Sequence, residues 1–282
     1  MTKRSILEYR GEVSPVWCSF CGDYAVLNSL YQVFQRKKLA PEEIVLVSGI
    51  GCSSRLPHFV NAYGFHGVHG RTLPTAMGIK LANPQLTVIA VAGDGDGFGI
   101  GLGHFIHTAR KNPDLKYLVM DNSLYAQTKG QVSPTTCPHR VTPSTPYGVM
   151  EEPINPIALA ILSGATFVAR AYSGKPELLT ELLLQAIDHP GFAFIQIISP
   201  CVTFNPTDTY RSLTQKSYLV SDYPLEDRVK ALELAQAEDR MALGLFYRVR
   251  RPTIEEAVRE IVEAAQREGP AELAGLVEKF NV

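Results

Sequence analysis

The sequence lacks three features that would each indicate a class of protein: an excess of charge, a long apolar run and a repeat. Its formal net charge is −1, so nothing favours electrostatic binding of nucleic acid. No run approaches the roughly 20 apolar residues that span a membrane, and the first residues, MTKRSILEYRGEV, hold no apolar stretch of signal-peptide length. We therefore expect a soluble, cytoplasmic chain with no nucleic-acid or membrane partner.

Cysteine is also scarce. Five cysteines in a chain of 282 residues do not make a disulfide scaffold. In a reducing compartment such thiols are free, bound to a metal or catalytic. The odd number indicates that at least one of them lies outside any shared site.

Apolar runs alternate with segments of helical periodicity through most of the chain. The runs are continuous rather than alternating, which is typical of strands in a parallel sheet covered on both faces. We expect strands over 44–51, 86–95, 115–123, 167–172 and 191–200, and helices over 21–36, 71–82, 100–111, 153–165 and 176–189. Residues 124–150, rich in Thr, Pro, Gly and Tyr, predict a long ordered loop. The fold class is therefore α/β.

The end of the chain has a different pattern. The stretch EDRVKALELAQAEDRMA is charged and amphipathic, and Thr253 and Glu256 stand at the spacing of a capping box before a segment that closes at Gly269. We expect one ligand-binding domain over residues 1–220 and a C-terminal helical tail over 221–282.

The stretch GDGDGFGIGLGH, residues 93–104, follows an apolar run directly. A glycine-rich turn at the carboxyl end of a parallel strand is a common place to bind phosphate. Two aspartates in such a turn would repel phosphate, unless carboxylate and phosphate bind the same divalent cation. The third glycine also stands at the wrong place for the dinucleotide fingerprint. The turn therefore favours a Mg²⁺–phosphate site.

A second ligand for this cation should come from the neighbouring strand end. Asn122 follows Asp94 by 28 residues, an interval that one helix and one strand fill. GDG followed at this distance by Asn is similar to the thiamine diphosphate signature, in which Asp94, Asn122 and the carbonyl of Leu124 look like Mg²⁺ ligands. The alternatives are a turn with capping aspartates and a nicotinamide site.

Four of the cysteines stand where strand or helix ends can bring them together. Cys18 and Cys21 form a C-x-x-C pair before a helix, Cys52 follows the first strand, and Cys201 follows the last. One pair with two single thiols is compatible with a 4Fe–4S cluster, and zinc or unrelated thiols are the alternatives. Cys137, in the long loop, is expected to be a bystander.

These motifs, in this order, resemble those of one family. The sequence resembles the β subunit of the 2-oxoacid:ferredoxin oxidoreductases, and more closely the 2-oxoglutarate type. The likeness is carried by WCSFCGD, GIGCSS, HGVHGRTLPTAMGIKLANP, GDGDG, DNSLYAQTKGQVSPTT, SPCVTFN and LGLFYRVRRPT. The resemblance implies a thiamine diphosphate-binding fold for the main domain.

The resemblance also implies site residues. It makes Cys18, Cys21, Cys52 and Cys201 the ligands of one 4Fe–4S cluster. The residues that it places around thiamine diphosphate and Mg²⁺ are Ile50, Gly51, Cys52, Ser53, His69, Gly93, Asp94, Gly95, Asp96, Asn122 and Leu124. Four positions depart from the family pattern: Ser19-Phe20 replace Pro-Gly, Asp121 replaces Asn, and Cys137 replaces a neutral residue.

The activity implied is the CoA-dependent oxidative decarboxylation of a 2-oxoacid, with electrons passed singly through the cluster to ferredoxin. For 2-oxoglutarate the products are succinyl-CoA and CO₂, and the reaction can be reversible. The activating Glu of such enzymes lies on a second α/β domain, for which this chain has no room. We expect a larger α subunit to supply it within an α2β2 assembly, and no catalytic residue is assigned on this chain.

Two cations are candidates for substrate recognition. Lys129 stands where pyruvate-type relatives resemble TGGQ, and Arg55 follows Cys52 by three residues. Either could pair with the distal carboxylate of 2-oxoglutarate, and a solvated surface charge is the alternative for each. Two other functions stay open on the sequence: a cluster-free thiamine diphosphate decarboxylase or synthase, and a non-catalytic nucleotide- or metal-binding module.

Overall fold

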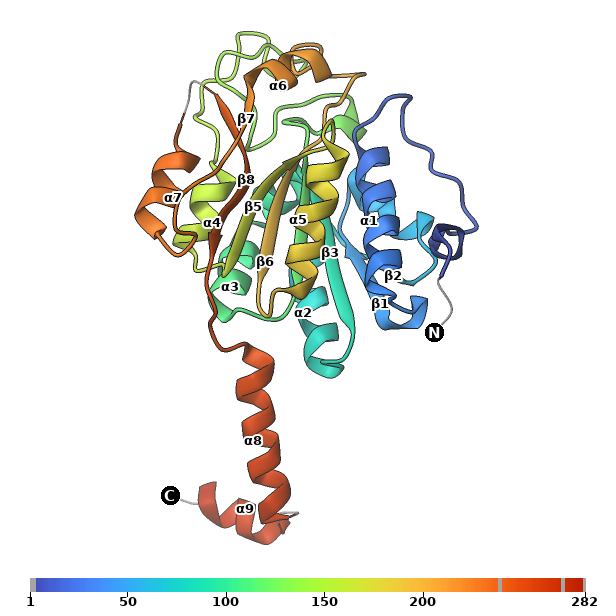
Figure 1. Ribbon diagram of the computed structural model, residues 1–282. Coiled ribbons are helices and arrows are strands. Elements are labelled where there is room, and N and C mark those ends of the chain that lie inside the picture. The colour runs from blue at the N-terminus through green and yellow to red at the C-terminus, as the bar shows by residue number, and fades with distance from the viewer. Residues whose placement is uncertain (1–3, 238–239, 270–271, 281–282) are drawn as a thin grey trace.

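The computed structural model describes residues 4–237, 240–269 and 272–280. Its centre is an eight-stranded sheet with the order β2-β1-β3-β4-β6-β5-β8-β7 (Figure 1). The strands are β1 (Ile44–Ser48), β2 (Tyr63–His66), β3 (Thr87–Gly93), β4 (Lys116–Asp121), β5 (Phe167–Tyr172), β6 (Ala193–Ile198), β7 (Ser217–Leu219) and β8 (Met241–Arg248). All neighbours pair in parallel except β5 and β8, which are antiparallel. The expected mostly parallel α/β sheet is confirmed.

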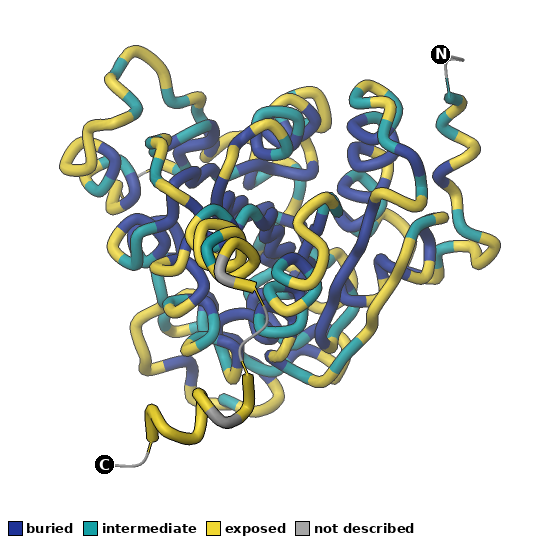
Figure 2. Tube along the Cα trace, turned by 90° about the horizontal axis from the view of Figure 1, so that it is seen from below, coloured by how far each residue is buried: buried dark blue, intermediate teal, exposed yellow. Residues whose placement is uncertain are grey.

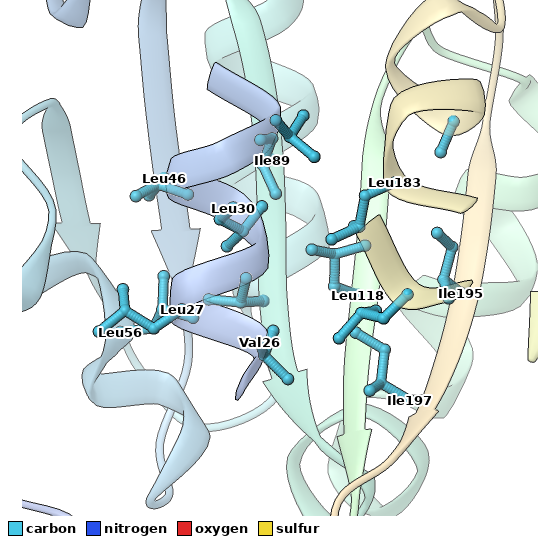
Figure 3. Packing of buried hydrophobic residues seen from close by; sticks show 14 of the residues in the cluster. Val26, Leu27, Leu30, Leu46, Leu56, Ile89, Leu118, Leu183, Ile195 and Ile197 are labelled. Atoms are coloured by element: carbon cyan, nitrogen blue, oxygen red, sulfur yellow. The ribbon is translucent and has the colours of Figure 1, made fainter. Parts of the chain in front are cut away.

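Helices cover both faces of this sheet. The helices are α1 (Asp23–Lys37), α2 (Thr72–Ala82), α3 (Leu102–Lys111), α4 (Pro156–Leu162), α5 (Pro176–Asp188), α6 (Tyr210–Lys216), α7 (Arg228–Ala235), α8 (Ile254–Glu268) and α9 (Leu273–Phe280). Buried side chains of α1 and α5 form one core with the sheet, and those of α2, α3, α4 and α7 form a second. In Figure 3, Val26, Leu27 and Leu30 of α1 lie over the strands that carry Leu46 and Ile89.

The inner strands β1, β3, β4 and β6 are buried along nearly their whole length because both faces of the sheet are covered there. Every residue of β1 and β4 is buried, which is why their sequences read as continuous apolar runs. The edge strand β2 is exposed at all four positions. Its sequence, YGFH, has no apolar run, so sequence reasoning did not find it.

The end of the chain differs from the helical tail expected over 221–282. Strand β8 lies inside this range and pairs with β5, so part of the tail belongs to the sheet. The sequence pattern does not predict this strand, because arginines stand at its ends, Arg240 and Arg248, and Gly244 interrupts it. Helix α7 also lies in this range and packs into the second core. The helical segment that leaves the domain begins after Thr253, whose predicted capping box with Glu256 is present. The division into two domains stays a prediction.

From this point α8 and α9 project from the domain (Figure 1), and their surfaces are mostly exposed when seen from below (Figure 2). Among the described residues, no helix combines the length and apolar character needed to cross a membrane.

Candidate functional site

The carboxyl ends of β1, β3, β4 and β6 lie side by side in the sheet. The loops that follow β1, β2, β3 and β4 surround a cavity of about 320 Å³. Every residue that the sequence assigned to thiamine diphosphate or Mg²⁺ lines it: Ile50, Gly51, Cys52, Ser53, His69, Gly93, Asp94, Gly95, Asp96, Asn122 and Leu124. The structure thus brings these residues together, and their binding roles stay predictions.

Asp94 is the buried acid of this cavity. Its carboxylate accepts hydrogen bonds from the backbone N–H of Asn122 at 3.4 Å and from the Thr135 hydroxyl at 3.0 Å. Burial, with the neighbouring Asp121 carboxylate as a second cause, raises the pKa of Asp94 to about 8. Two buried carboxylates side by side repel each other. The Asp94 carboxylate, the Asn122 amide oxygen and backbone carbonyls are hard oxygen donors, so the site fits Mg²⁺.

Asp121, which departs from the family pattern, is held by groups that sequence reasoning missed. Its carboxylate accepts from Gln196 at 2.7 Å and lies 2.8 Å from the Thr135 hydroxyl, whose single hydrogen it shares with Asp94. Gln196 in turn accepts from the partly buried Arg170 at 2.8 Å. Burial raises the pKa of Asp121, and the Gln196 and Thr135 hydrogen bonds and the Arg170 charge oppose that rise. Arg170 therefore balances part of the charge that Asp121 adds.

Asp96 has a different role from Asp94. One carboxylate oxygen accepts from the amides of Ile50 at 3.0 Å and Gly70 at 2.8 Å, and contacts Nδ1 of His69 at 2.6 Å. The other accepts from Thr72 at 3.3 Å. With four protein partners, Asp96 ties the loop after β1 and the loop before α2 to the glycine turn. It holds Ile50 and His69 at the cavity.

The alternating glycines have separate reasons. A Cβ on Gly95 would collide with the ring of Tyr125, whose hydroxyl donates to the Gly95 carbonyl at 3.0 Å. The segment Asp96–Ile100 is a π-helical turn, so α3 begins after it at Leu102. A Cβ on Gly101 would lie 2.5 Å from the carbonyl oxygen of Asp96 in this turn, and a Cβ on Gly103 would meet nothing within 4 Å. Close approach of the helix to the sheet, which we expected for Gly101 and Gly103 from the sequence, therefore explains neither glycine.

A second cavity, of about 260 Å³, holds the thiols. Cys18, Cys21, Cys52 and Cys201 all line it, and Cys137 does not. Burial raises the pKa of Cys21, and Asp23, Cys201 and Cys52 add to the rise. Burial likewise raises the pKa of Cys52 to about 11, with smaller contributions from Asp23, Cys201 and Cys18. Four thiols that line one cavity form a suitable donor set for iron once deprotonated.

The thiols share a cavity without converging on one point. Among the described residues, no group of three or more His, Cys, Asp or Glu side chains is arranged to hold a metal ion. The loops that carry the thiols are nevertheless fastened. The Trp17 indole donates to the Cys52 carbonyl at 2.7 Å, and the Ser199 hydroxyl donates to Asp23 at 2.7 Å. Trp17 and Ser199 flank the cysteine motifs in the sequence, but their partners are distant along the chain.

The two candidate substrate cations lie in different surroundings. Arg55 lines the thiol cavity and also a third cavity of about 300 Å³, which it shares with His58 and His66. Lys129 is exposed at the end of a short 3₁₀ turn, with a positive φ of 79°, and lines none of these three cavities. The geometry therefore favours Arg55 over Lys129.

Comparison with known proteins adds an independent line of evidence. Residues 49–197 match the family model described as thiamine pyrophosphate enzyme, C-terminal TPP binding domain. Residues 201–263 match the family model for the C-terminal part of the pyruvate ferredoxin oxidoreductase beta subunit.

Two curated relatives and one solved structure are similar over most of this chain. Subunit beta of 2-oxoacid:ferredoxin oxidoreductase 1 from Aeropyrum pernix is 44% identical, covering 88% of this chain and 82% of its own. The 2-oxoglutarate oxidoreductase subunit KorB of Mycobacterium tuberculosis is 34% identical over 92% and 82%. A 2-oxoglutarate:ferredoxin oxidoreductase from Magnetococcus marinus, solved with 2-oxoglutarate, coenzyme A and succinyl-CoA bound, matches with a TM-score of 0.94 and 38% identity over 100% and 97%.

Proposed function

The chain belongs to the β-subunit family of the 2-oxoacid:ferredoxin oxidoreductases, and from that premise we propose that it carries the thiamine diphosphate and the 4Fe–4S cluster of such an enzyme. One observation carries this proposal. The cavity lined by the Mg²⁺ candidates and the cavity lined by the four thiols adjoin, and Cys52 lines both. A group that yields electrons and a group that accepts them would therefore be neighbours.

Thiamine diphosphate, when bound, would supply the carbanion that attacks a 2-oxoacid and would accept the electron pair that the substrate leaves behind when CO₂ departs. The residues of this chain bind and orient it. Asp94, Asn122 and the Leu124 carbonyl would hold Mg²⁺ beside the diphosphate, and Gly93 and Gly95 would let the backbone approach it. The remaining candidates, Ile50 to Ser53, His69 and Asp96, border the same cavity.

The cluster would be held by Cys18, Cys21, Cys52 and Cys201. Binding of iron requires the thiols to lose their protons, and the raised pKa values of Cys21 and Cys52 oppose that loss until the metal is present. Binding of iron is therefore coupled to release of protons in this cavity. Ferredoxin, named as the partner of several relatives, would receive the electrons, and coenzyme A would receive the acyl group.

The chain would be half of an active site. Membership of a β-subunit family implies an α partner, which we propose supplies the Glu that activates thiamine diphosphate, in an α2β2 assembly. Apolar side chains beside the cavity support such a partner: Ile50, Val68 and Ile100 are exposed in this chain.

We propose 2-oxoglutarate as the substrate because several relatives carry that name and because Arg55 lines the thiol cavity and the third cavity. Exchanging Arg55 for Ala should lower kcat/KM for 2-oxoglutarate more than for pyruvate. The matched change Lys129→Ala should alter the ratio less, because Lys129 is outside the cavities. An unchanged ratio in Arg55→Ala would remove this residue from substrate selection.

The test of the function is anaerobic co-purification of the chain with its partner, followed by analysis of thiamine diphosphate, iron and acid-labile sulfide. We expect both cofactors, and reduction of ferredoxin by 2-oxoglutarate in the presence of coenzyme A. Cys52→Ser should lose the cluster held by this chain, whereas the matched Cys137→Ser should keep it.

Three outcomes would contradict the proposal. Thiamine diphosphate without iron would indicate a cluster-free decarboxylase or synthase. Neither cofactor, with no dye reduction by any 2-oxoacid, would indicate a binding module. Substantial 2-oxoacid oxidation by the purified chain alone would exclude the divided active site.

A further inference from the structure

Two loops at the carboxyl edge carry the residues proposed for the two cofactors. One follows β4 and begins at Asn122, and the other follows β6 and contains Cys201. Their parent strands are neighbours in the sheet, with Asp121 opposite Ile198. Beyond these strand ends the backbone ladder stops, so the spacing of the two loops depends on side chains.

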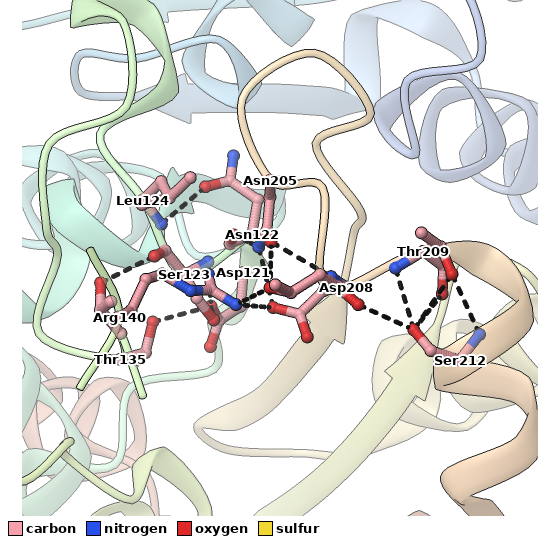
Figure 4. Close-up of polar contacts among 12 residues, drawn as sticks. Asp121, Asn122, Ser123, Leu124, Thr135, Arg140, Asn205, Asp208, Thr209 and Ser212 are labelled. Atoms are coloured by element: carbon pink, nitrogen blue, oxygen red, sulfur yellow. Dashed lines mark hydrogen bonds and ion pairs between the residues drawn. The ribbon is translucent and has the colours of Figure 1, made fainter. Parts of the chain in front are cut away.

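Asn205 joins the two loops. Its backbone amide donates to the Cys201 carbonyl at 2.9 Å, and its side-chain amide donates to the Asn122 carbonyl at 3.0 Å. Figure 4 shows Asn205 beside Asn122 and Asp208. Asn205 is only 2% exposed, so water does not compete for these hydrogen bonds.

The side chain of Asn205 is used to its full capacity. The second amide hydrogen is donated to Asp208 at 2.8 Å, and the amide oxygen accepts from the Thr207 hydroxyl at 2.9 Å and the Asp208 backbone amide at 3.1 Å. Asp208 is itself fixed by the Arg140 guanidinium at 2.8 Å. A side-chain amide is a planar group with two N–H donors and an oxygen that accepts two hydrogen bonds, so asparagine provides all four interactions. Aspartate has the same shape, but its carboxylate would place an oxygen, instead of the two N–H groups, against the Asn122 carbonyl oxygen and the Asp208 carboxylate.

Asn205 acts through other residues, because it lines neither the thiamine diphosphate cavity nor the thiol cavity. We propose that Asn205 is the positioning residue that sets the spacing between the Asn122 loop and the Cys201 loop, and so aligns the two cofactor sites. The alignment of cofactors rests on the proposed function. The hydrogen-bonded bridge between the loops does not depend on the proposed function, and it can be tested without any cofactor.

The main test is Asn205→Asp in the anaerobically purified complex. We expect the dissociation constant of thiamine diphosphate with Mg²⁺ to rise about 10- to 100-fold, as when hydrogen-bond partners of metal ligands are removed. We expect the electron paramagnetic resonance spectrum of the reduced cluster to change in the same variant. Asn205→Ala, which removes the donor without adding charge, should show both effects in smaller measure.

Asn155→Asp is the matched control. Asn155 caps α4 and donates to the Ala235 carbonyl at 2.7 Å, so the same exchange breaks a similar hydrogen bond away from both cavities. It should leave the affinity and the spectrum unchanged even if Tm falls. Thr207→Val removes one partner of the Asn205 oxygen but keeps both bridging donors, and it should also leave them unchanged. Equal effects in either control would overturn the proposal, as would a change at only one site in Asn205→Asp.

A second measurement uses the full chain without cofactors. Alkylation of Cys201 by iodoacetamide, compared with that of the exposed Cys137 as internal reference, should be faster in Asn205→Asp and Asn205→Ala than in the unaltered chain. An unchanged ratio would overturn the bridge. Loss of the proposed function shows itself separately, as the absence of iron or thiamine diphosphate from the unaltered complex.

Discussion

Asp96 shows how a single residue organises the site. The sequence assigned it to the cofactor, and the structure has its carboxylate accept from Ile50, Gly70 and Thr72 and contact His69. These partners come from the loops after β1 and before α2. A buried carboxylate with several donors is costly to replace, because each donor would lose its acceptor together with the charge.

At this scale we expect Asp96→Asn to lower the free energy of unfolding by about 1–3 kcal/mol, since an amide would direct hydrogens at the donors. Thiamine diphosphate affinity should fall in the same variant, because Ile50 and His69 lose their support. Chemical denaturation and equilibrium dialysis measure the two effects. The control is Asp188→Asn, an exposed acid that pairs with Lys37. Unaltered affinity in Asp96→Asn would show that these loops hold their place without it.

At the scale of elements, the amino edge of the sheet fastens the start of the projecting helix α8. Asn112 donates to the carbonyls of Arg251 at 3.2 Å and Pro252 at 3.0 Å, and it accepts from Thr166 at 2.7 Å. His189 reaches the same Thr166 hydroxyl at 2.8 Å. One hydrogen-bonded chain therefore connects the end of α5, the start of β5 and the segment before α8.

This network predicts a pH dependence. Burial lowers the pKa of His189 to about 4, and the nearby Lys116 charge adds to the shift. The unfolded chain takes up this proton near pH 6.5 and the folded chain only near 4, so stability is lost as pH falls through that window. Between pH 6.5 and 4.5 this effect should lower the free energy of unfolding by an amount on the order of 1–2 kcal/mol, and His189→Gln should abolish that decrease. Urea unfolding at each pH measures it. The exposed His107→Gln should leave it in place, and equal slopes for the His189 variant and the unaltered chain would refute the assignment.

At the scale of the whole molecule, the site lies at an open edge. Val68, next to His69, is 73% exposed, and Ile50 and Ile100 are also exposed beside the cavity. A cofactor that must be kept from water needs a cover, and the larger subunit is the proposed cover.

We expect Val68→Asp to weaken association with the larger subunit about tenfold or more, because a charge would be buried in the interface. The stability of the chain alone should change by no more than about 0.5 kcal/mol, as for other exposed positions. Leu162→Asp is the control, since Leu162 is 61% exposed at the end of α4 toward the opposite edge. Titration calorimetry with the purified partner measures the affinity, and equal weakening by both variants would contradict an interface at the carboxyl edge.

The sequence by itself determined the features that depend on neighbours along the chain. Continuous apolar runs predicted the parallel strands, and the capping box of Thr253 predicted the start of α8. The positions of Asp94 and Asn122 after two such strands predicted that they would meet, because the carboxyl ends of parallel strands share one edge.

Only the tertiary structure decided which distant side chains support that edge. Asn205 reaches Asn122 across 83 positions of the chain, and Gln196 reaches Asp121 across 75. Tertiary structure also placed Arg55 at the cavities and Lys129 outside them, and it added β8 to the sheet. Hydrogen bonds of this kind have no local pattern, because they arise only when the packing of the core brings separate strand ends within about 3 Å of each other's polar groups.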